Sequence, residues 1–171
     1  MSDVALRRVA SADIDVLVAF RVRLQREARN EESDPAIQKR WHDFFSGGLR
    51  AGTIVPWIAE DAGRPVAVAL GYIRPYLPRE GFINDCEARI HNVFVDSAYR
   101  RRGIGRRIVT ALLDDLRARG PYRIVLSPTD EARPLYASLG FNPSSEMVLK
   151  LSGARPRTVL HRVFIVAGMV D

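Results

Sequence analysis

The sequence predicts one α/β (α+β) domain, in which helices flank a single mixed, mostly antiparallel sheet. Two strand-like runs, TIVPWIAED at 53–61 and VAVALGYIR at 66–74, are neighbours in the sequence and predict an antiparallel hairpin. Strand and helix patterns then alternate, which is typical of a sheet with helices packed against it. The 171 residues are 47% hydrophobic, which is enough to bury one core of ordinary size.

The N-terminal third predicts one strand and two helices. A short strand is expected over residues 5–9, followed by a helix over 12–29 with Ser11 as its N-cap. A second helix is expected to begin at the Ser-Asp-Pro cap at 33–35 and to end at Gly47-Gly48.

The middle of the chain predicts a hairpin turn and a long loop. The turn Ala62-Gly63-Arg64-Pro65 joins the two strands of the hairpin. The segment 74–87 contains two prolines and mixed charge, so we expect an irregular surface loop, of a length that is often functional. A strand from 88 to 95 should follow it.

The C-terminal third predicts two helices and two further strands. An apolar stripe indicates a helix from 104 to 119, and Gly120-Pro121 should stop it. A strand over 122–126, a short helix over 130–139 and an alternating strand over 146–151 complete the predicted elements.

The predicted domain covers residues 1–151, and residues 152–171 form a C-terminal extension. Its run VFIVAGMV at 163–170 is so apolar that an exposed edge strand there would favour aggregation. We therefore expect the extension to add a strand or to dock on a second copy of the chain, as in a homodimer.

Charge and composition limit the classes of partner. The net charge of +6 suggests an anionic partner, which is a nucleic acid, a membrane surface or a phosphorylated ligand. Cys86 is the only cysteine, so neither an intramolecular disulfide nor a cysteine zinc site is expected, and no metal constellation is visible. The apolar runs are too short to cross a bilayer, so the sequence predicts a soluble, cytoplasmic protein that binds no membrane.

The segment NVFVDSAYRRRGIGRR at 92–107 is the strongest candidate for anion binding. It matches neither the Walker nor the dinucleotide-binding template, since it lacks the required lysine and third glycine. A glycine turn before a helix still presents unpaired backbone N–H groups to an anion. Arg106 and Arg107 lie in the first helical turn, where the helix dipole disfavours a cation by about 0.3–1 kcal/mol. A bound polyanion would explain them, although a solvated helix start or a patch for a nucleic-acid backbone is also consistent.

Two motifs carry a resemblance to a known family. The string from Arg100 to Gly105, RRRGIG, follows the strand NVFV and resembles the Arg/Gln-x-x-Gly-x-Gly/Ala motif of the GNAT superfamily of N-acetyltransferases. The segment RPLYASLGF at 133–141 resembles the Leu-Tyr-x-x-x-Gly-Phe segment of the same family. The similarity extends from about Val4 to Leu151 and implies a GNAT-like acyl-CoA N-acyltransferase fold.

The resemblance implies that acetyl-CoA is the acyl donor. Backbone amides of the glycine turn would hold its pyrophosphate, and the end of the strand at 93–95 would pair with its pantetheine arm, where an N–H polarises the thioester carbonyl. The implied cofactor-binding residues are Val93, Phe94, Val95, Arg100, Arg101, Arg102, Gly103, Ile104, Gly105, Arg106, Arg107 and Arg133.

The resemblance also implies catalytic residues. Tyr136 matches the family tyrosine that protonates the departing thiolate, although packing alone would also explain it. Glu87 is the first choice for the general base and His91 the second, with water as an alternative. The two lie four residues apart in a strand and share a face. A strand-edge charge and a core histidine are their ordinary structural roles.

The acceptor is expected to be a primary amine on a small molecule or peptide. A mildly acidic set suits a cationic amine, and Glu27, Tyr76 and Asp85 are its predicted substrate-binding members; the others are Glu31, Glu32, Asp34 and Glu80. The function that follows is acetyl transfer from acetyl-CoA by direct attack. A CoA-binding protein that is non-catalytic or uses another acyl group is the alternative. A basic nucleic-acid-binding domain is a distant one, because no recognition motif for nucleic acid is present.

Overall fold

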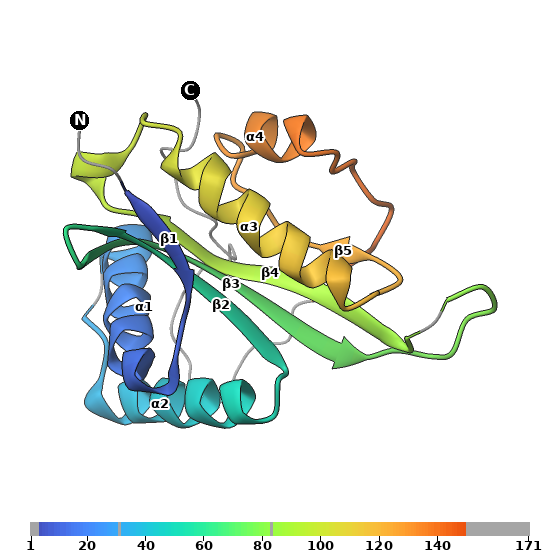
Figure 1. Ribbon diagram of the computed structural model, residues 1–171, viewed down its shortest axis with the longest axis horizontal. Coiled ribbons are helices and arrows are strands. Elements are labelled where there is room, and N and C mark those ends of the chain that lie inside the picture. Colours follow the sequence, from blue (N-terminus) through green and yellow to red (C-terminus); the bar gives the residue numbers. More distant parts are fainter. Residues whose placement is uncertain (1–3, 31, 83, 150–171) are drawn as a thin grey trace.

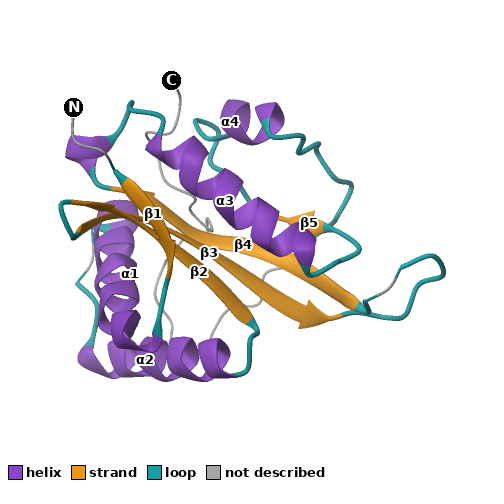
Figure 2. Cartoon of the chain, viewed as in Figure 1, coloured by secondary structure: helices purple, strands orange, loops and turns teal. Residues whose placement is uncertain are grey.

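The computed structural model describes residues 4–30, 32–82 and 84–149, which form one five-stranded sheet with helices on both faces. Neighbouring strands in the order β1-β2-β3-β4-β5 are antiparallel, except that β5 is parallel to β4. Helices α1 and α2 cover one face, and α3 and α4 lie on the other (Figure 1, Figure 2). The predicted fold class is confirmed. The elements are β1 (Ala5–Arg8), α1 (Ile14–Arg29), α2 (Pro35–Arg50), β2 (Ile54–Asp61), β3 (Arg64–Pro75), β4 (Cys86–Val95), α3 (Ile104–Ala118), β5 (Ile124–Val125) and α4 (Arg133–Ser138).

Two apolar layers hold the helices on the sheet. On the α3 face, Leu112 and Leu116 are fully buried. A Cβ at Gly71 of β3 would lie 2.8 Å from Leu116 Cδ2, so glycine at this position lets α3 approach the strand closely. On the other face, Phe20 and Phe45 of α1 and α2 pack on β2, β3 and β4. The sheet is thus buried on both sides along its centre.

The helix starts follow the predicted chemistry only in part. The Asp34 carboxylate accepts a hydrogen bond from Ala36 N at 2.7 Å, and Pro35 occupies the first turn of α2 as expected. The prediction that Ser11 caps the first helix is wrong. Residues Ser11–Asp13 form a 3₁₀ turn, and the Asp13 carboxylate accepts a hydrogen bond from Ala10 N at 2.8 Å.

The predicted end of α2 at Gly47-Gly48 is also wrong, because the helix continues to Arg50. A Cβ at Gly48 would lie 2.8 Å from Ile54 Cγ2, so this glycine allows close packing of α2 against β2. The chain turns instead at Gly52, whose φ of 68° is in the left-handed region that glycine adopts readily.

The C-terminal part departs most from prediction. The strand expected over 122–126 is reduced to Ile124–Val125, and the residues 146–149 of the expected strand over 146–151 are irregular. Met147 and Leu149 on one side of that alternating pattern are 99% and 85% exposed, and Val148 on the other side is 76% exposed, so neither face is buried. Glu146 is held by an ion pair with Arg123 rather than by a strand ladder. The predicted extension at 152–171 lies outside the described residues.

Candidate functional site

A β-bulge interrupts β4 at the centre of the sheet. His91 pairs with Leu70 of β3 and Phe94 pairs with Val68, so β4 contains one residue more than β3 between these pairs. Asn92 has a φ of 49°, which is a strained, left-handed conformation for a residue with a side chain. The extra residue shifts the alternation of side chains between the two faces of the sheet.

The bulge changes which side chains face α3. Ala88 and Ile90 pack under α3, and beyond the bulge Val93 and Val95 join them. Phe94 packs on the opposite face with α1 and α2. Simple alternation along β4 would have placed Val93 and Val95 on the same face as His91.

The end of β4 has a free edge beside the bulge. β5 pairs with β4 only at Ala88 and Arg89, whereas β4 continues to Val95. No other strand in the described part of the chain covers that edge from Ile90 onward. Backbone N–H and C=O groups on it are therefore available to an extended ligand that adds as a strand would.

The start of α3 lies just beyond this edge and presents further backbone donors. Gly103 is the N-cap residue with a φ of 70°, and Arg101 two residues before it is also left-handed, with a φ of 62°. Arg107 N donates to Gly103 O at 3.1 Å, which is the first hydrogen bond of the helix. The N–H groups of Ile104, Gly105 and Arg106 precede that bond and point out of the helix end, where an anion binds favourably.

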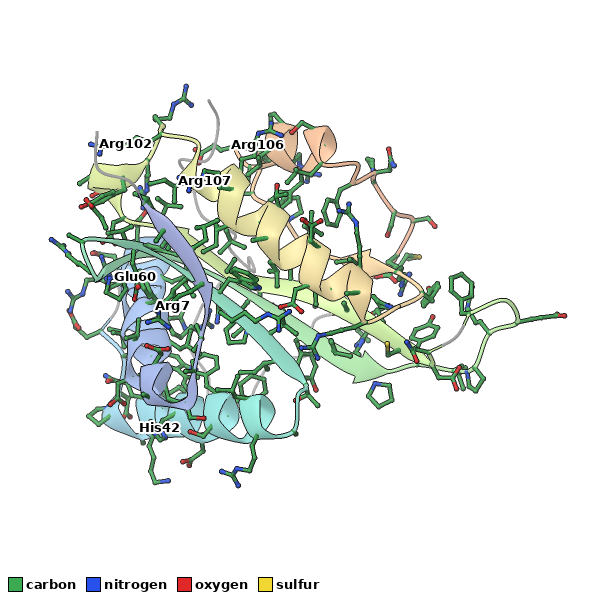
Figure 3. All side chains as sticks on the ribbon, in the orientation of Figure 1. Arg7, His42, Glu60, Arg102, Arg106 and Arg107 are labelled. Atoms are coloured by element: carbon green, nitrogen blue, oxygen red, sulfur yellow. The ribbon has the colours of Figure 1, made fainter. Side chains whose placement is uncertain are left out.

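The arginines near the start of α3 fall into two groups, those that surround the helix end and Arg100, whose side chain is bound within the protein. Arg102, Arg106 and Arg107 gather around the start of α3 (Figure 3). Arg106 donates to Ser138 Oγ and Arg107 to Val4 O, each at 2.7 Å, so both charges face neutral oxygens. The Arg102 guanidinium lies 5.2 Å from the centre of the Tyr99 ring. Arg101 is exposed, and Arg133 Nε forms an ion pair with Asp130 Oδ1 at 2.9 Å.

Arg100 has a different role, because its side chain is bound within the protein. It donates to Val95 O at 2.9 Å and to both carboxylate oxygens of Glu27 at 2.6 and 2.7 Å. This contact joins α1 to the end of β4. The carboxylate of Glu27 pairs with Arg100, and its assignment to substrate binding stays a prediction.

Tyr136 of α4 is buried in the α3 layer together with Ile90 and Val93. Its ring meets Phe141 edge to face, with 5.7 Å between the ring centroids. The hydroxyl is buried and has no hydrogen-bond partner among the described residues. Burial raises the pKa of the phenol above its ordinary value, so the group stays protonated at neutral pH. An orphaned buried donor suggests that a ligand supplies its acceptor.

Glu87 is fully buried, which excludes the ordinary role of an exposed strand-edge charge. Its carboxylate accepts hydrogen bonds from Arg74 Nε at 2.8 Å and from Arg123 Nε at 2.5 Å. Burial opposes ionisation, but the bonds from Arg123 and Arg74 outweigh it and hold the pKa of Glu87 below its usual value. A carboxylate bound in this way is a weak base, which argues against the predicted catalytic role.

His91 is half-buried on the face of β4 that α1 and α2 cover. Burial lowers its pKa to about 4, and the positive charges of Arg89 and Arg21 add to the effect. The imidazole is therefore neutral at pH 7, and its conjugate acid is too strong for efficient removal of a proton from an ammonium ion.

The predicted acceptor residues do not converge. Glu27 lies beside Val95 through Arg100, whereas Tyr76 and Asp85 lie next to the first residue of β4. At about 3.3 Å per residue the ten-residue strand puts roughly 30 Å between these ends. Tyr76 stacks with Tyr122 at 4.7 Å, and Asp85 is exposed.

Residues beside His91 were missed by the sequence analysis. Arg89 shares its face of β4, and Arg21 Nη1 donates to Asn92 Oδ1 at 2.9 Å. The Arg21 guanidinium also lies 5.4 Å from the centre of the Trp41 ring. The two-residue spacing of Arg89 and His91 could have indicated the first of these neighbours, but no local pattern identifies a contact between α1 and a bulge in β4.

Residues 4–30, 32–82 and 84–149 contain no group of three His, Cys, Asp or Glu side chains arranged to bind a metal ion. Among the same residues, no helix has the length and apolar character that crossing a membrane requires.

Comparison with known proteins identifies relatives of this chain. A model of the Acetyltransferase (GNAT) family matches residues 17–141. Glucosamine 6-phosphate N-acetyltransferase 1 from Oryza sativa is 36% identical over 86 residues, which are 49% of this chain and 50% of that protein. N-alpha-acetyltransferase RimI from Mycobacterium tuberculosis is 34% identical over 100 residues, 58% of this chain and 52% of that protein. The chain thus spans about half the length of these curated relatives.

Solved structures agree with the fold over more of the chain. A GCN5-related N-acetyltransferase from Ralstonia eutropha is 27% identical, with a TM-score of 0.75 over 88% of this chain and 100% of that one. A predicted acetyltransferase from Clostridium acetobutylicum, solved with acetyl-CoA, is 25% identical, with a TM-score of 0.76 over 88% and 96% of the two chains.

The ion pairs of Glu87 lead to a prediction about stability. Glu87→Gln removes the anion paired with Arg74 and one of the two anions paired with Arg123, so we expect the free energy of unfolding at pH 7 to fall by about 1–3 kcal/mol. Because the folded-state pKa of Glu87 is lowered, its contribution is present above the unfolded pKa and is lost as pH falls through the folded value. Urea unfolding at pH 7 and pH 3 should show the difference shrinking at the lower pH.

Glu80→Gln is the matched control, since Glu80 is exposed in the β3–β4 loop. It should change the free energy of unfolding by less than about 0.5 kcal/mol. Equal effects of the two substitutions at pH 7 would contradict the structural role of Glu87.

Proposed function

The chain belongs to the acetyltransferase (GNAT) family, and from that premise we propose that it transfers an acetyl group from acetyl-CoA to a primary amine by direct attack. One observation supports this most. The free edge of β4 lies near the start of α3, where an anion would bind. The Tyr136 hydroxyl, which has no hydrogen-bond partner among the described residues, is buried in the layer that Ile90 and Val93 of the same strand help to form. A pyrophosphate, an extended amide-bearing arm and a thioester sulfur follow one another in the same order in acetyl-CoA.

The residues at the end of α3 fit a pyrophosphate. The N–H groups of Ile104, Gly105 and Arg106 would donate to its oxygens, and the left-handed turn at Gly103 aims them outward. Arg106 and Arg107, which donate to the neutral oxygens Ser138 Oγ and Val4 O among the described residues, would add electrostatic attraction. The cations that oppose the helix dipole in the free protein would then stabilise the bound anion.

The edge of β4 would position the pantetheine arm and the reacting carbonyl. On the edge of β4 away from β3, no strand in the described part of the chain pairs with the main chain from Ile90 onward. Apart from Val95 O, which accepts a hydrogen bond from Arg100, the main-chain groups on this edge can pair with the amides of the arm. A backbone N–H at the bulge would donate to the thioester oxygen, where negative charge develops during attack. Acetyl-CoA supplies the activated acetyl group.

Tyr136 would complete the transfer as the acid. The amine nitrogen forms a bond to the carbonyl carbon, the carbon–sulfur bond breaks, and the Tyr136 hydroxyl donates its proton to the sulfur. Its raised pKa keeps the proton in place until sulfur becomes basic. Phe141 and the apolar residues around it exclude water from the hydroxyl.

The proton on the amine must leave by another route. Glu87 is held by two arginines and His91 has a pKa of about 4, so neither is suited to remove it near pH 7. We assign this step to water, and a proton from solvent returns to the Tyr136 phenolate after the CoA thiol has left. Neutral His91 can accept a hydrogen bond from the amine and orient its lone pair.

The nature of the acyl group and of the acceptor is part of the proposal. A related structure with acetyl-CoA and relatives described as acetyltransferases support acetyl as the transferred group. The names of those relatives include glucosamine 6-phosphate and a protein α-amine as acceptors, so both small molecules and peptides belong in an assay. The cytoplasmic location and the homodimer stay predictions.

Release of CoA thiol in the presence of an amine panel tests the proposal. The panel should contain amino sugars and their phosphates, amino acids, polyamines, aminoglycosides and peptides. Thiol release with at least one amine, together with a rise in melting temperature on adding acetyl-CoA, is expected. Stabilisation without release would favour a non-catalytic CoA-binding protein, and binding of oligonucleotides without any effect of CoA would favour the nucleic-acid alternative.

Two substitutions should separate cofactor binding from chemistry. Gly103→Glu places a carboxylate at the pyrophosphate and should weaken CoA binding by about tenfold or more. Tyr136→Phe should lower kcat by about 10²-fold or more with unchanged CoA affinity. It should also raise the melting temperature of the free protein, because it removes an unsatisfied buried hydroxyl. Calorimetric titration with CoA and steady-state kinetics measure these effects.

Gly81→Glu is the control for backbone strain, since Gly81 has a φ of 84° in the exposed β3–β4 loop. It should leave CoA affinity unchanged. Equal loss of CoA affinity in Gly103→Glu and Tyr136→Phe would contradict the two assignments.

The low pKa of His91 predicts the shape of the pH profile. Because His91 is already neutral above pH 5, kcat/KM should rise with pH as the acceptor amine loses its proton, without an inflection near 6.5. His91→Gln should keep that shape. A wild-type inflection near 6.5 that disappears in His91→Gln would instead identify His91 as the general base.

A further inference from the structure

The face of β4 toward α1 and α2 is the less covered side of the proposed reaction centre. On the opposite face Ile90, Val93 and Tyr136 are buried in the layer that α3 packs on. His91, on the face toward α1 and α2, is only partly buried. Its cross-strand partner Leu70 packs in the layer of α1 and α2, which confirms the direction of this face. We therefore expect an acceptor amine to reach the bulge past His91.

Aromatic side chains lie along this approach. Tyr72 of β3 is two residues beyond Leu70 on the same face, so it is the diagonal neighbour of His91, at about 7–8 Å. The Phe44 ring of α2 meets the Tyr72 ring, with 5.9 Å between the ring centroids. Trp41 lies three residues before Phe44 in α2 and packs against the same layer. Rings from α2 and β3 thus lie next to the side of β4 that presents His91.

A side-chain bridge connects this aromatic group to the bulge. The Arg21 guanidinium lies 5.4 Å from the centre of the Trp41 ring, and its Nη1 donates to Asn92 Oδ1 at 2.9 Å. The rings of α2 are therefore close to the residue at which the alternation of β4 changes.

The aromatic group keeps apolar surface that is not buried in the core. Phe44 is 50% exposed, whereas its neighbour Phe45 is only 3% exposed. Tyr72 and Trp41 are partly buried. A single exposed ring is common on protein surfaces, but this one continues into Tyr72 and lies beside the proposed reaction centre. A ligand that covered these rings would gain the free energy of removing apolar area from water.

The polar side chains on the same stretch of β4 are compatible with an aromatic ligand. His91 is neutral at pH 7 and can accept a hydrogen bond from an amine. Arg89 is the cross-strand partner of Tyr72, and a guanidinium packs favourably over the face of an aromatic ring.

We propose that the acceptor is a primary amine that carries an aromatic ring on a short carbon chain, and that Phe44 and Tyr72 bind this ring while His91 faces the amine. Aromatic rings attract one another in tilted or offset arrangements with centroids about 4.5–7 Å apart, as Phe44 and Tyr72 already do. The diagonal spacing of Tyr72 and His91 suits a ring and an amine joined by one or two carbons. This inference rests on the proposed acetyl transfer and specifies the apolar part of its acceptor.

Matched acceptors test the inference. 2-Phenylethylamine is ethylamine with a phenyl ring added, and 2-cyclohexylethylamine has a saturated ring of similar size. We expect kcat/KM of the full chain, calculated for the neutral amine, to be about tenfold or more higher for 2-phenylethylamine than for ethylamine. The value for 2-cyclohexylethylamine should be about threefold lower than for 2-phenylethylamine, because a saturated ring lacks the ring–ring attraction.

Substitution of Phe44 tests whether that ring provides the preference. Phe44→Ala should lower the ratio of kcat/KM for 2-phenylethylamine to that for ethylamine by about tenfold, and Phe44→Leu, which keeps apolar area without a ring, should give an intermediate ratio. The matched control is Phe82→Ala, since Phe82 is 47% exposed but contacts Tyr122 instead of Tyr72. The control should leave the ratio unchanged, and CoA affinity should be the same in all three variants.

The outcomes distinguish the inference from the function on which it rests. Turnover of ethylamine or of the saturated ring as good as that of 2-phenylethylamine, or turnover confined to amines without an aromatic ring, would overturn the inference and leave acetyl transfer intact. An equal loss of kcat/KM for both amines in Phe44→Ala would also overturn it, since Phe44 would then contact another part of the protein rather than the acceptor. Thiol release with none of the amines tested, despite CoA binding, would overturn the proposed function and the inference with it.

Discussion

The extra residue at Asn92 is the constraint on which the rest of the site depends. By shifting the alternation along β4, it turns Val93 and Val95 toward α3 and leaves His91 and Arg89 on the opposite face. β5 pairs with only two residues of β4, so the strand has a free edge next to the bulge. One local distortion, of a kind that often occurs near functional sites, would therefore separate the proposed surface for a CoA arm from the proposed surface for an acceptor.

Unsatisfied groups lie beside that edge. The start of α3 presents backbone donors and the cations of Arg106 and Arg107, whose hydrogen-bond partners among the described residues are neutral oxygens, and the Tyr136 hydroxyl is buried without an acceptor among the same residues. Each arrangement costs stability in the free protein. Both costs would be removed by one ligand that carries an anion at one end and an acceptor for the tyrosine at the other. Elsewhere in the core, Leu112 and Leu116 pack closely on Gly71.

The sequence was sufficient for the architecture and for the glycine turn before α3, because both depend on local patterns. Periodicity and glycine positions predicted the helix α3, the hairpin of β2 and β3 and the turn at Gly103. The errors concern long-range contacts. Nothing near Glu87 in the sequence indicates that Arg123, 36 residues away, will neutralise it, and nothing near Glu27 indicates Arg100, 73 residues away. The bulge was also missed, because the run of residues around Asn92 fits a regular strand. The acidic acceptor set stays a prediction, and the basic side chains of Arg89 and Arg21 near His91 were not anticipated.

The central claim is that the amides at the start of α3 hold the pyrophosphate of CoA. A crystal structure of the complex with CoA tests it most directly. The claim predicts pyrophosphate oxygens about 2.9 Å from the backbone nitrogens of Ile104, Gly105 and Arg106, with the pantetheine arm along the free edge of β4. A pyrophosphate bound elsewhere, with those three N–H groups facing solvent, would contradict it.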